Sequence, residues 1–509
     1  MTALATCLSG RLTLPVVRQI DVQLPNAEHA RLSELAARIA ADEPALSCFD
    51  VFGRDVVVGL DGAPALLFED HSEISLCTTQ REEVFRYRSL LLAGDGDLVL
   101  IGGRRHAAFE QYCRDVVGMG DPSIVALPPL SRRRLSSLAE RCTVNERAFN
   151  MILDIARRGR RINLIPYLGT GSVWKLAGRI GAATGARVQV AAPPPRLAQR
   201  VNDKLWFDQR VIEVIGKEAR PPNYHAFGPA AVAGRIAQIA RRSERVVVKV
   251  PDSAGSAGNI VLDSASVRRF PLSRVRNQIL TVLRARGWSS QFPLLVGVWD
   301  CEVLSSPSVQ VWVPLAEQGL PVIEGLFEQL VCGAEGQFIG ATAIQLTEQL
   351  RQRLATEAMQ LACLFQKLGY FGRCSFDAII AGRDWRSADV RWIECNGRWG
   401  GTSIPMTLAN RLTGDWTQRE MMILQRLDLK MRRYGLPAAL DLLDNVLYRH
   451  DGDGTGVIIT NPGQLEQGAG LHMVLLGRDR SHVQQQLAQV EEIFLEIGQG
   501  STGTTALLH

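Results

Sequence analysis

Short apolar runs alternate with amphipathic stretches over roughly residues 1–190. Residues 56–58, 98–101 and 124–127 are apolar and rich in β-branched side chains, which predicts buried strands. Residues 145–157 and 173–183 repeat apolar side chains every three or four positions, which predicts helices. Alternation of this kind is typical of an open α/β sheet. We therefore expect an α/β domain that ends near the proline cluster at residues 193–195.

From about residue 202 the pattern changes to strand pairs with helices between them. Residues 245–250 and 260–262 are expected to form a hairpin around a glycine-rich turn. Residues 294–299 and 308–313 are expected to pair with each other around a proline-containing loop. This second part is therefore expected to be a mixture of hairpins and helices, unlike the first part.

A long helix is predicted over residues 350–368, followed by strands at residues 374–380 and 390–395. Beyond residue 440 the pattern predicts two more strands and a last helix, at residues 457–460, 471–476 and 482–497. The fold class expected is therefore multidomain, with α/β and α+β parts. The expected domains are an α/β domain, a central domain and a small α+β domain, at residues 1–198, 199–432 and 433–509.

Length and charge agree with this division and exclude several classes of protein. At ~100–200 residues per domain, 509 residues suggest about three domains. The formal net charge is only +5, and a run of three arginines at residues 132–134 follows a proline-rich turn instead of lying in a basic stripe. Nucleic acid is therefore not expected as a main partner.

The distribution of apolar residues and cysteines bears on the compartment. No apolar run approaches the ~18 residues that suggest a membrane span, and the first residues lack the pattern of a signal peptide. The ten cysteines are scattered, with no two within four residues of each other, which is typical of reduced thiols. We therefore expect a cytoplasmic protein with no membrane partner.

The loop after Lys249 is the first candidate for binding chemistry. Small residues let backbone N–H groups approach an anion closely, and a lysine on the strand entering the turn can reach a phosphate. The candidate ligands are Lys249, Asp252, Ser253, Gly255, Ser256, Ala257 and Gly258. The spacing is not that of a Walker P-loop, and the chain returns as a strand. The alternative interpretation is an ordinary flexible hairpin loop.

Lysine is rare in this chain, which makes each lysine conspicuous. Only six residues are lysines, and arginine supplies the other basic side chains. Lys249 lies on an expected central strand, and Lys204 opens the region that contains the hairpin. The alternative for Lys204 is a surface lysine at the start of a helix.

A second group of polar residues lies on the strands at residues 374–380 and 390–395. Glu394 and Asn396 are two positions apart and share a face of their strand, and a hairpin would bring Asp377 opposite them. Two carboxylates and an amide oxygen repel one another unless a hard cation such as Mg²⁺ lies between them. Arg398 continues on the same face and can brace a phosphoryl group. The alternative is a half-exposed hairpin with a polar face.

These residues resemble a known family, the ATP-grasp superfamily. The match covers roughly residues 200–415 and consists, in order, of Lys204, Lys249 before its small-residue loop, Asp377, Glu394, Asn396 and Arg398. Residues 165–167, 202–204, 306–310 and 328–329 look in addition like the ATP-grasp peptide ligases of the pheganomycin-biosynthesis type. Such ligases have a pre-ATP-grasp domain in front and a small domain behind, which agrees with the three expected domains.

The resemblance implies a role for each matching residue. Lys204 and Lys249 would contact the phosphates of ATP, and residues 252–259 would close over them. Asp377, Glu394 and Asn396 would hold one or two Mg²⁺, with Mn²⁺ as a substitute, and Arg398 would stabilise a developing acyl phosphate. The purine would lie near Asp300, Cys301 and Val303. Two positions depart from the usual pattern, since Asp300 and Asp377 stand where the family often has glutamate.

The resemblance implies an ATP-dependent carboxylate–amine ligase that forms an amide or peptide bond through an acyl phosphate. ADP and phosphate would be the co-products, and the substrates would be a small carboxylate and an amine or peptide, in specialised metabolism. A carboxylate–thiol ligase or an acyl-phosphate-forming enzyme is one alternative, and a non-catalytic ATP-binding regulatory module is another. The identities of the acid and the amine are not readable, and a homodimer is expected only on base rates.

Overall fold

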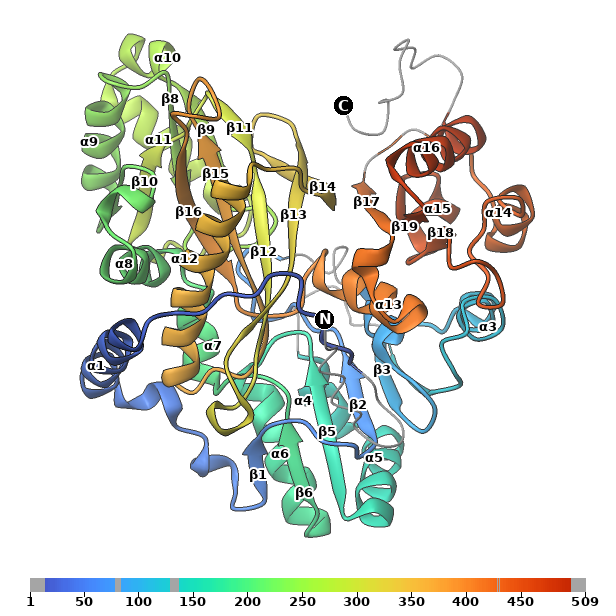
Figure 1. Cartoon of the computed structure of the whole chain (residues 1–509). Coiled ribbons are helices and arrows are strands. Elements are labelled where there is room, and N and C mark those ends of the chain that lie inside the picture. Colours follow the sequence, from blue (N-terminus) through green and yellow to red (C-terminus); the bar gives the residue numbers. More distant parts are fainter. Residues whose placement is uncertain (1–13, 78–83, 129–136, 428, 430, 496–509) are drawn as a thin grey trace.

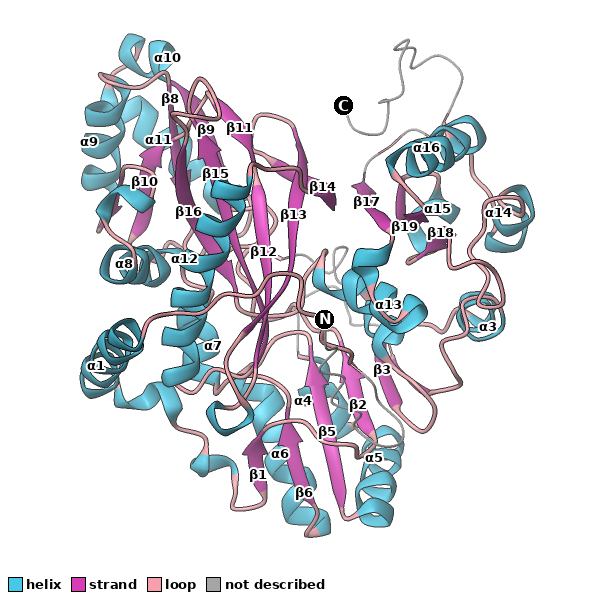
Figure 2. Cartoon of the chain, in the orientation of Figure 1, coloured by secondary structure: helices cyan, strands magenta, loops and turns pink. Residues whose placement is uncertain are grey.

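Three β-sheets organise the part of the chain that the structure describes (Figure 1). In this computed structural model the described residues are 14–77, 84–128, 137–427, 429 and 431–495. The arginine run at residues 132–134 and the end of the predicted last helix lie outside them. Figure 2 shows that each sheet has its own set of helices packed beside it.

The first sheet has six parallel strands. Their order across the sheet is β1 (Val56–Val58), β6 (Arg187–Val190), β5 (Arg161–Pro166), β2 (Ala65–Phe68), β3 (Leu98–Gly102) and β4 (Ser123–Leu127). The helices of this part are α1 (Asn26–Asp42), α3 (Ala107–Asp115), α4 (Leu138–Val144), α5 (Glu146–Gly159) and α6 (Gly171–Thr184), with short 3₁₀ turns at η1 (Pro44–Ser47), η2 (Asp50–Phe52) and η3 (Arg88–Leu92). The predicted open α/β sheet is confirmed.

The second sheet is antiparallel and has four strands. Their order is β7 (Asn223–Ala226), β10 (Leu294–Val298), β8 (Arg245–Lys249) and β9 (Asn259–Asp263). The helices α9 (Pro229–Ala240), α10 (Ser264–Arg269) and α11 (Leu272–Ala285) pack with it around one apolar core. Before this sheet come α7 (Pro195–Val201), α8 (Lys204–Val214) and η4 (Lys217–Ala219).

The third sheet is also antiparallel and has nine strands. Eight of them follow the order β11 (Val303–Ser305), β15 (Gly372–Ala381), β12 (Pro307–Val313), β13 (Val322–Cys332), β14 (Gln337–Ala343), β17 (Glu420–Leu427), β19 (Gly470–Gly477) and β18 (Gly456–Ile459). The ninth strand, β16 (Asp389–Asn396), pairs with β15. The remaining elements are η5 (Ala316–Gln318), α12 (Glu348–Lys367), α13 (Ser403–Thr413), η6 (Trp416–Gln418), α14 (Leu436–Leu442), α15 (Gly463–Gln467) and α16 (Arg480–Phe494).

One predicted strand pairing is wrong. Residues 294–299 and 308–313 both contain strands, but β10 pairs with β7 and β8, whereas β12 pairs with β13 and β15. The two strands therefore belong to different sheets. The connection between them crosses from the four-stranded sheet to the nine-stranded one and includes β11, the first strand of the larger sheet.

The large sheet continues into the last part of the chain. Strand β17 pairs with β19 over eight positions, and β19 pairs with β18, so these strands extend the sheet that begins at β11. The division at residue 433 stays a prediction.

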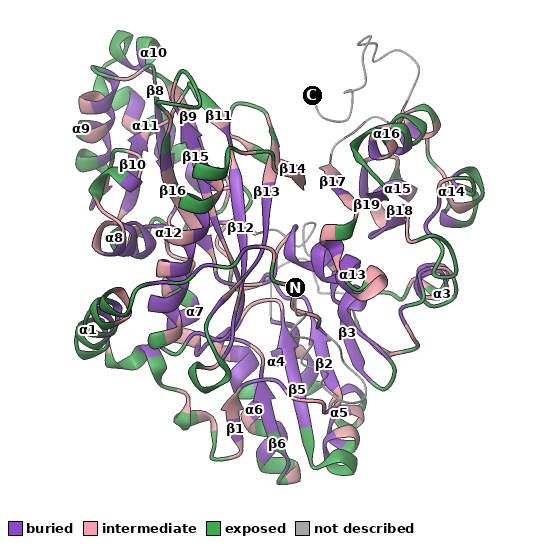
Figure 3. Cartoon of the chain, in the orientation of Figure 1, coloured by how far each residue is buried: buried purple, intermediate pink, exposed green. Residues whose placement is uncertain are grey.

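Burial follows the sheets, with buried strands in the centre and exposed helix faces outside (Figure 3). One apolar cluster joins residues of the first sheet, the large sheet and the last helices, including Leu67, Phe327 and Leu475. This shared core holds the first sheet against the large sheet. None of the described helices is long and apolar enough to cross a membrane.

Candidate active site

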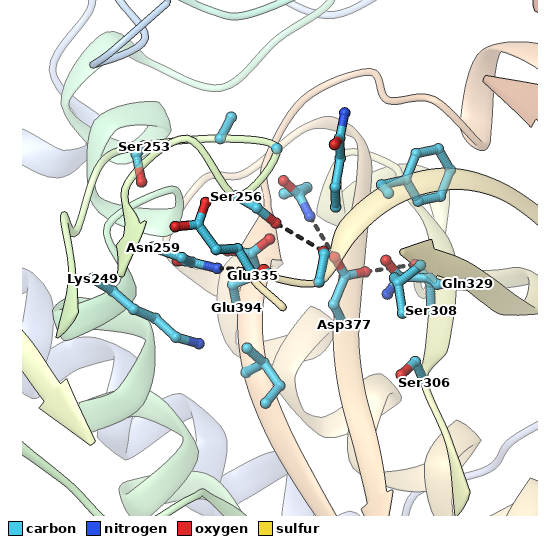
Figure 4. A pocket seen from close by; sticks show the side chains of 18 of the residues that line it. Lys249, Ser253, Ser256, Asn259, Ser306, Ser308, Gln329, Glu335, Asp377 and Glu394 are labelled. Carbon is cyan, nitrogen blue, oxygen red and sulfur yellow. Dashed lines mark hydrogen bonds between the residues drawn. The ribbon is translucent and has the colours of Figure 1, made fainter. Parts of the chain in front are cut away.

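A cavity of about 770 Å³ lies where the three sheets meet. Its wall includes most of the residues that the sequence singles out: Lys204, Lys249, Ser253, Gly255, Ser256, Asp300, Cys301, Val303, Asp377, Glu394, Asn396 and Arg398. Figure 4 shows Lys249 on one side of the cavity, Ser308 and Gln329 on the opposite side, and Glu394 and Asp377 between them. Residues from separate parts of the chain are therefore brought to one place.

The β15–β16 hairpin places the two candidate carboxylates opposite each other. Asp377 is in register with Glu394, and Ser375 is in register with Asn396. The amide Nδ2 of Asn396 donates to Asp377 Oδ2 over 2.8 Å, and the Ser308 hydroxyl donates to Asp377 Oδ1 over 2.6 Å. The hairpin geometry predicted for these residues is confirmed, and the polar face points into the cavity.

This pair of carboxylates fits a divalent cation. Burial, together with the charge of Glu394, raises the pKa of Asp377 to about 7. A hard cation between the two carboxylates would offset their repulsion, and oxygen ligands are what Mg²⁺ prefers. Among the described residues, no three His, Cys, Asp or Glu side chains converge on one point, so the third oxygen would come from the amide of Asn396.

Lys204 reaches the same place from the start of α8. Its side chain is buried, and Nζ lies 2.8 Å from Glu394 Oε2 and donates to the backbone oxygen of Ser253 over 2.7 Å. Burial alone would raise the pKa of Glu394, but the charge of Lys204 lowers it below its usual value. The alternative of a surface lysine is wrong for Lys204, because the helix N-terminus delivers it to the interior. Asp203 caps this helix by accepting from two backbone N–H groups.

Lys249 approaches the same carboxylates from the end of β8. Burial lowers the pKa of this lysine to about 8, and Lys204 adds to the effect. Its Nζ lies 5.8 Å from the centre of the Trp299 ring. The two ammonium groups and the two carboxylates therefore share one cavity wall. An anionic ligand bound there would stabilise the charged form of both lysines.

The small-residue loop after Lys249 covers this corner of the cavity. Gly255 and Ser256 both have positive φ, at 58° and 62°, which turns the chain sharply. The Ser256 hydroxyl donates to the backbone oxygen of Gly336 over 2.9 Å, which ties the loop to the β13–β14 turn. A Cβ atom at Gly258 would lie 2.2 Å from the Ser253 hydroxyl, so only glycine fits there.

Three of the predicted loop ligands lie away from the main cavity wall. Asp252 accepts a hydrogen bond from the Ser75 hydroxyl over 2.5 Å. Ala257 lines a smaller pocket behind the loop, and Gly258 packs at the base of the loop against Ser253. Their predicted contacts with phosphate stay predictions.

Arg398 lies directly after the carboxylate hairpin. Its Nη2 donates to Asn396 Oδ1 over 2.6 Å, and its Nη1 donates to Asn202 Oδ1. The buried Nε group has no hydrogen-bond partner among the described residues. The guanidinium is therefore held in place beside the carboxylates with its Nε–H still available.

At the other end of the cavity, Asp300 follows β10. Its Oδ1 accepts from Arg391 over 2.6 Å, whereas its buried Oδ2 has no partner among the described residues. Burial raises the pKa of Asp300, and Arg391 opposes this. Beside it the wall is apolar, with Val247, Leu295, Val298, Ile379 and Trp392. An apolar slot with one acceptor suits a flat heteroaromatic ring.

Sequence reasoning missed a group of cavity residues contributed by the first part of the chain, which contains the six-stranded sheet. His71, Phe85, Arg88 and Tyr167 line the cavity, and none of them was singled out as a ligand. Tyr167 follows β5, and residues 69–71 follow β2, its neighbour in the sheet. Carboxyl ends of neighbouring parallel strands are a common place for ligand sites, and polar residues after apolar runs could have signalled this one.

Comparisons with known proteins agree with this arrangement. The pre-ATP-grasp domain family matches residues 86–182. Among solved structures, the biotin carboxylase domain of a Hydrogenobacter thermophilus 2-oxoglutarate carboxylase, in complex with MgADP, ADP and bicarbonate, has a TM-score of 0.52 at 13% identity and covers 85% of this chain and 90% of its own. The chain has the ATP-grasp fold, preceded by a pre-ATP-grasp domain.

Two further solved structures were found in the same comparison. Campylobacter jejuni biotin carboxylase, in a βγ-ATP complex, has a TM-score of 0.50 at 12% identity, over 85% of this chain and 91% of its own. The N5-carboxyaminoimidazole ribonucleotide synthetase of Thermus thermophilus has a TM-score of 0.49 at 12% identity, over 85% and 99%. No curated protein matches the chain significantly. At these identities the likeness concerns the fold, and the activity is a matter for proposal.

Proposed function

We propose that this protein is an ATP-dependent carboxylate–amine ligase that forms an amide or peptide bond through an acyl phosphate. ADP and phosphate would be released. The single observation that carries the proposal is the pairing of Asp377 with Glu394 in a cavity that also holds Lys204, Lys249 and Arg398. This set is suited to a triphosphate, a divalent cation and a developing acyl phosphate.

The first step is governed by charge. A substrate carboxylate that attacks the γ-phosphorus of ATP approaches a polyanion, so positive charge must first surround the phosphates. Lys204 and Lys249 both line the cavity near Glu394 and would bind the phosphate oxygens. Arg398 would bind the oxygens of the acyl phosphate through its Nε–H and its other remaining N–H donors. Mg²⁺ bound by Asp377, Glu394 and Asn396 would supply further neutralisation of the triphosphate.

The loop at residues 252–259 would keep water from the acyl phosphate. It already contacts the β13–β14 turn through Ser256 and the first domain through Asp252. An amine then attacks the acyl carbon, the bond to phosphate oxygen breaks, and an amide remains. No side-chain nucleophile is required, because positioning and electrostatics lower the barrier.

A peptide ligase is the finer proposal, and it rests on the residues behind the resemblance. Tyr167, Ser308, Gln310 and Gln329 belong to the segments that look like pheganomycin-type ligases, and all four line the cavity. Amide and hydroxyl groups on the wall opposite Lys249 could pair with the backbone of a peptide substrate. A role in specialised metabolism belongs to the same proposal.

The test is ADP formation that depends on both an acid and an amine. A panel of N-acetylated amino acids is combined with a panel of free amino acids and dipeptides, with ATP and Mg²⁺, and released phosphate is measured. We expect turnover only when both substrates are present, with an amide detected by mass spectrometry. Turnover that requires a thiol instead of an amine would favour a carboxylate–thiol ligase, and nucleotide binding with no turnover in any combination would favour a regulatory module.

A further inference from the structure

A buried histidine–glutamate pair lies in the same cavity, on the side of the first domain. His71 Nε2 lies 2.6 Å from Glu69 Oε1, and both side chains are nearly inaccessible to solvent. The charge of Arg88 and the hydrogen bond from His71 lower the pKa of Glu69 although burial would raise it. Glu69 is therefore an anion, so the nitrogen of His71 that faces it must carry the proton.

In the neutral ring, this tautomer leaves Nδ1 as the accepting nitrogen. Nδ1 lies 3.7 Å from the Cys77 sulfur, and a thiol is a weak donor that an amine can displace. The ring is fixed by stacking on Tyr167, at 4.6 Å between ring centres and 27° between planes, and on Phe85 at 5.8 Å. A carboxylate that fixes the tautomer and a packed ring are what a proton acceptor needs.

The His71–Glu69 pair is linked at two points to the part of the cavity around Lys204, Lys249 and Arg398, which we call the phosphate corner. The backbone N–H of Trp399, next to Arg398, donates to the backbone oxygen of Tyr167 over 3.1 Å, and the Tyr167 ring stacks on His71. On the other side, Ser75 bridges to Ser253 in the phosphate loop. His71 thus lies on a segment held between the residue expected to bind the acyl phosphate and the loop expected to cover it.

The proposed reaction needs a proton acceptor at this place. An alkyl amine is protonated at neutral pH and cannot attack until it loses a proton. The ionisable side chains of the cavity near the loop have other tasks: Lys204, Lys249 and Arg398 are expected to bind phosphate oxygens, Asp377 and Glu394 are expected to bind a cation, and Glu335 pairs with Arg286 over 2.9 Å. The charged and titratable described groups packed around His71 are Glu69, Arg88, Cys77 and Tyr167, with His472 beyond Phe85.

We propose that His71, oriented by Glu69, is the general base that deprotonates the amine substrate. The ammonium gives one proton to His71 Nδ1, and the resulting imidazolium is stabilised by Glu69. The free amine attacks the acyl carbon and forms the C–N bond, the C–O bond to phosphate breaks, and the second amine proton leaves with the phosphate. His71 then returns its proton to solvent. This assignment rests on the ligase activity proposed above.

A reaction with hydroxylamine distinguishes a general-base role of His71 from a purely structural role. Hydroxylamine is mostly unprotonated at pH 7, so it traps an acyl phosphate as a hydroxamate without a base. For His71→Asn we expect hydroxamate formation within about threefold of wild type, and ligation of an alkyl amine reduced about 100-fold at pH 7. The deficit should shrink as the pH approaches the pKa of the amine substrate, because free amine then becomes abundant.

Two further variants complete the experiment. Glu69→Gln keeps the size of the side chain but removes the charge that stabilises the imidazolium, so ligation should fall about tenfold while hydroxamate formation persists. His106 forms the matched pair outside the cavity, with Nε2 3.0 Å from Glu466, and His106→Asn should leave both reactions unchanged.

The outcomes distinguish the two proposals. Equal loss of hydroxamate and amide in His71→Asn, or a deficit that does not change with pH, overturns the role of His71 and leaves the ligase proposal intact. If wild-type protein forms no hydroxamate with any acid of the panel, the ligase proposal fails, and the role of His71 fails with it.

Discussion

Lys204 and Glu394 form an ion pair of 2.8 Å between the first turn of α8 and the end of β16. The pair joins the candidate phosphate site to the candidate metal site through one contact. In the proposed complex with MgATP both partners would change roles, since Lys204 would bind a phosphate and Glu394 a cation. The ion pair therefore holds both side chains in the cavity until MgATP binds, when the phosphate replaces Glu394 beside Lys204 and the cation replaces Lys204 beside Glu394.

The first prediction concerns Glu394. Glu394→Ala should reduce ligase turnover at least about 100-fold, because a metal ligand is lost and Lys204 loses its partner. The fold should stay close to wild type by circular dichroism, since the side chain lies on a cavity wall. Glu244→Ala, which removes another glutamate of the same wall, is the control and should keep full turnover. Retained turnover in Glu394→Ala would contradict the assigned role.

The second prediction concerns Lys249 and stability. Burial lowers the pKa of Lys249, so the charged form is unfavourable in the protein without nucleotide. Lys249→Met should therefore raise the melting temperature of the nucleotide-free protein by about 1 °C, the effect of roughly 1 kcal/mol on a chain of this length. The same variant should lose the rise in melting temperature that MgATP produces in wild type. Differential scanning fluorimetry measures both, and a nucleotide-dependent shift that survives would count against this lysine.

The third prediction is the pH dependence of nucleotide affinity. The pKa of Lys249 is about 8 without ligand, and a bound triphosphate would raise it. Affinity should therefore fall as the pH rises above 8, by up to about tenfold per unit, because binding then requires uptake of a proton. Calorimetric titration with a non-hydrolysable ATP analogue in two buffers of different ionisation enthalpy detects that uptake. In Lys249→Met the dependence should disappear.

The fourth prediction concerns the purine end of the cavity. Asp300→Ala should raise the KM for ATP about 10- to 100-fold with little change in kcat, because a charged acceptor at the nucleotide is lost. Asp389 contacts Arg391, the partner of Asp300, over 3.4 Å but does not line the cavity. Asp389→Ala should therefore leave the KM unchanged, and a similar rise in both variants would assign the effect to Arg391.

Local sequence pattern was sufficient for many of the elements and for the carboxylate hairpin, although it did not predict strands β13, β14 and β17. The face shared by Glu394 and Asn396 follows from the two-residue repeat of a strand, and a short polar connection between two strands predicts an antiparallel pair. Asp377 opposite Glu394 follows from the same reasoning and is confirmed. These properties depend on neighbours in the chain, which is why sequence alone could predict them.

Strand pairings and side-chain contacts between segments that are far apart in the sequence could not be predicted in this way. Strands β10 and β12 follow each other in sequence, but β10 pairs with β7, a strand of four residues with little apolar pattern. His71 and Tyr167 meet because β2 and β5 are neighbours in a parallel sheet, although far apart in the chain. No spacing rule connects such residues, because tertiary packing alone decides which parallel strands become neighbours.

The most direct test of the account is a crystal structure with Mn²⁺ and an ATP analogue that has nitrogen between its β and γ phosphates. We predict an anomalous peak for Mn²⁺ about 2.1 Å from oxygens of Asp377, Glu394 and Asn396, with Lys204 and Lys249 on the phosphates and the purine beside Asp300. A cavity without nucleotide, or a metal bound elsewhere with the two carboxylates still facing Lys204, would contradict the account.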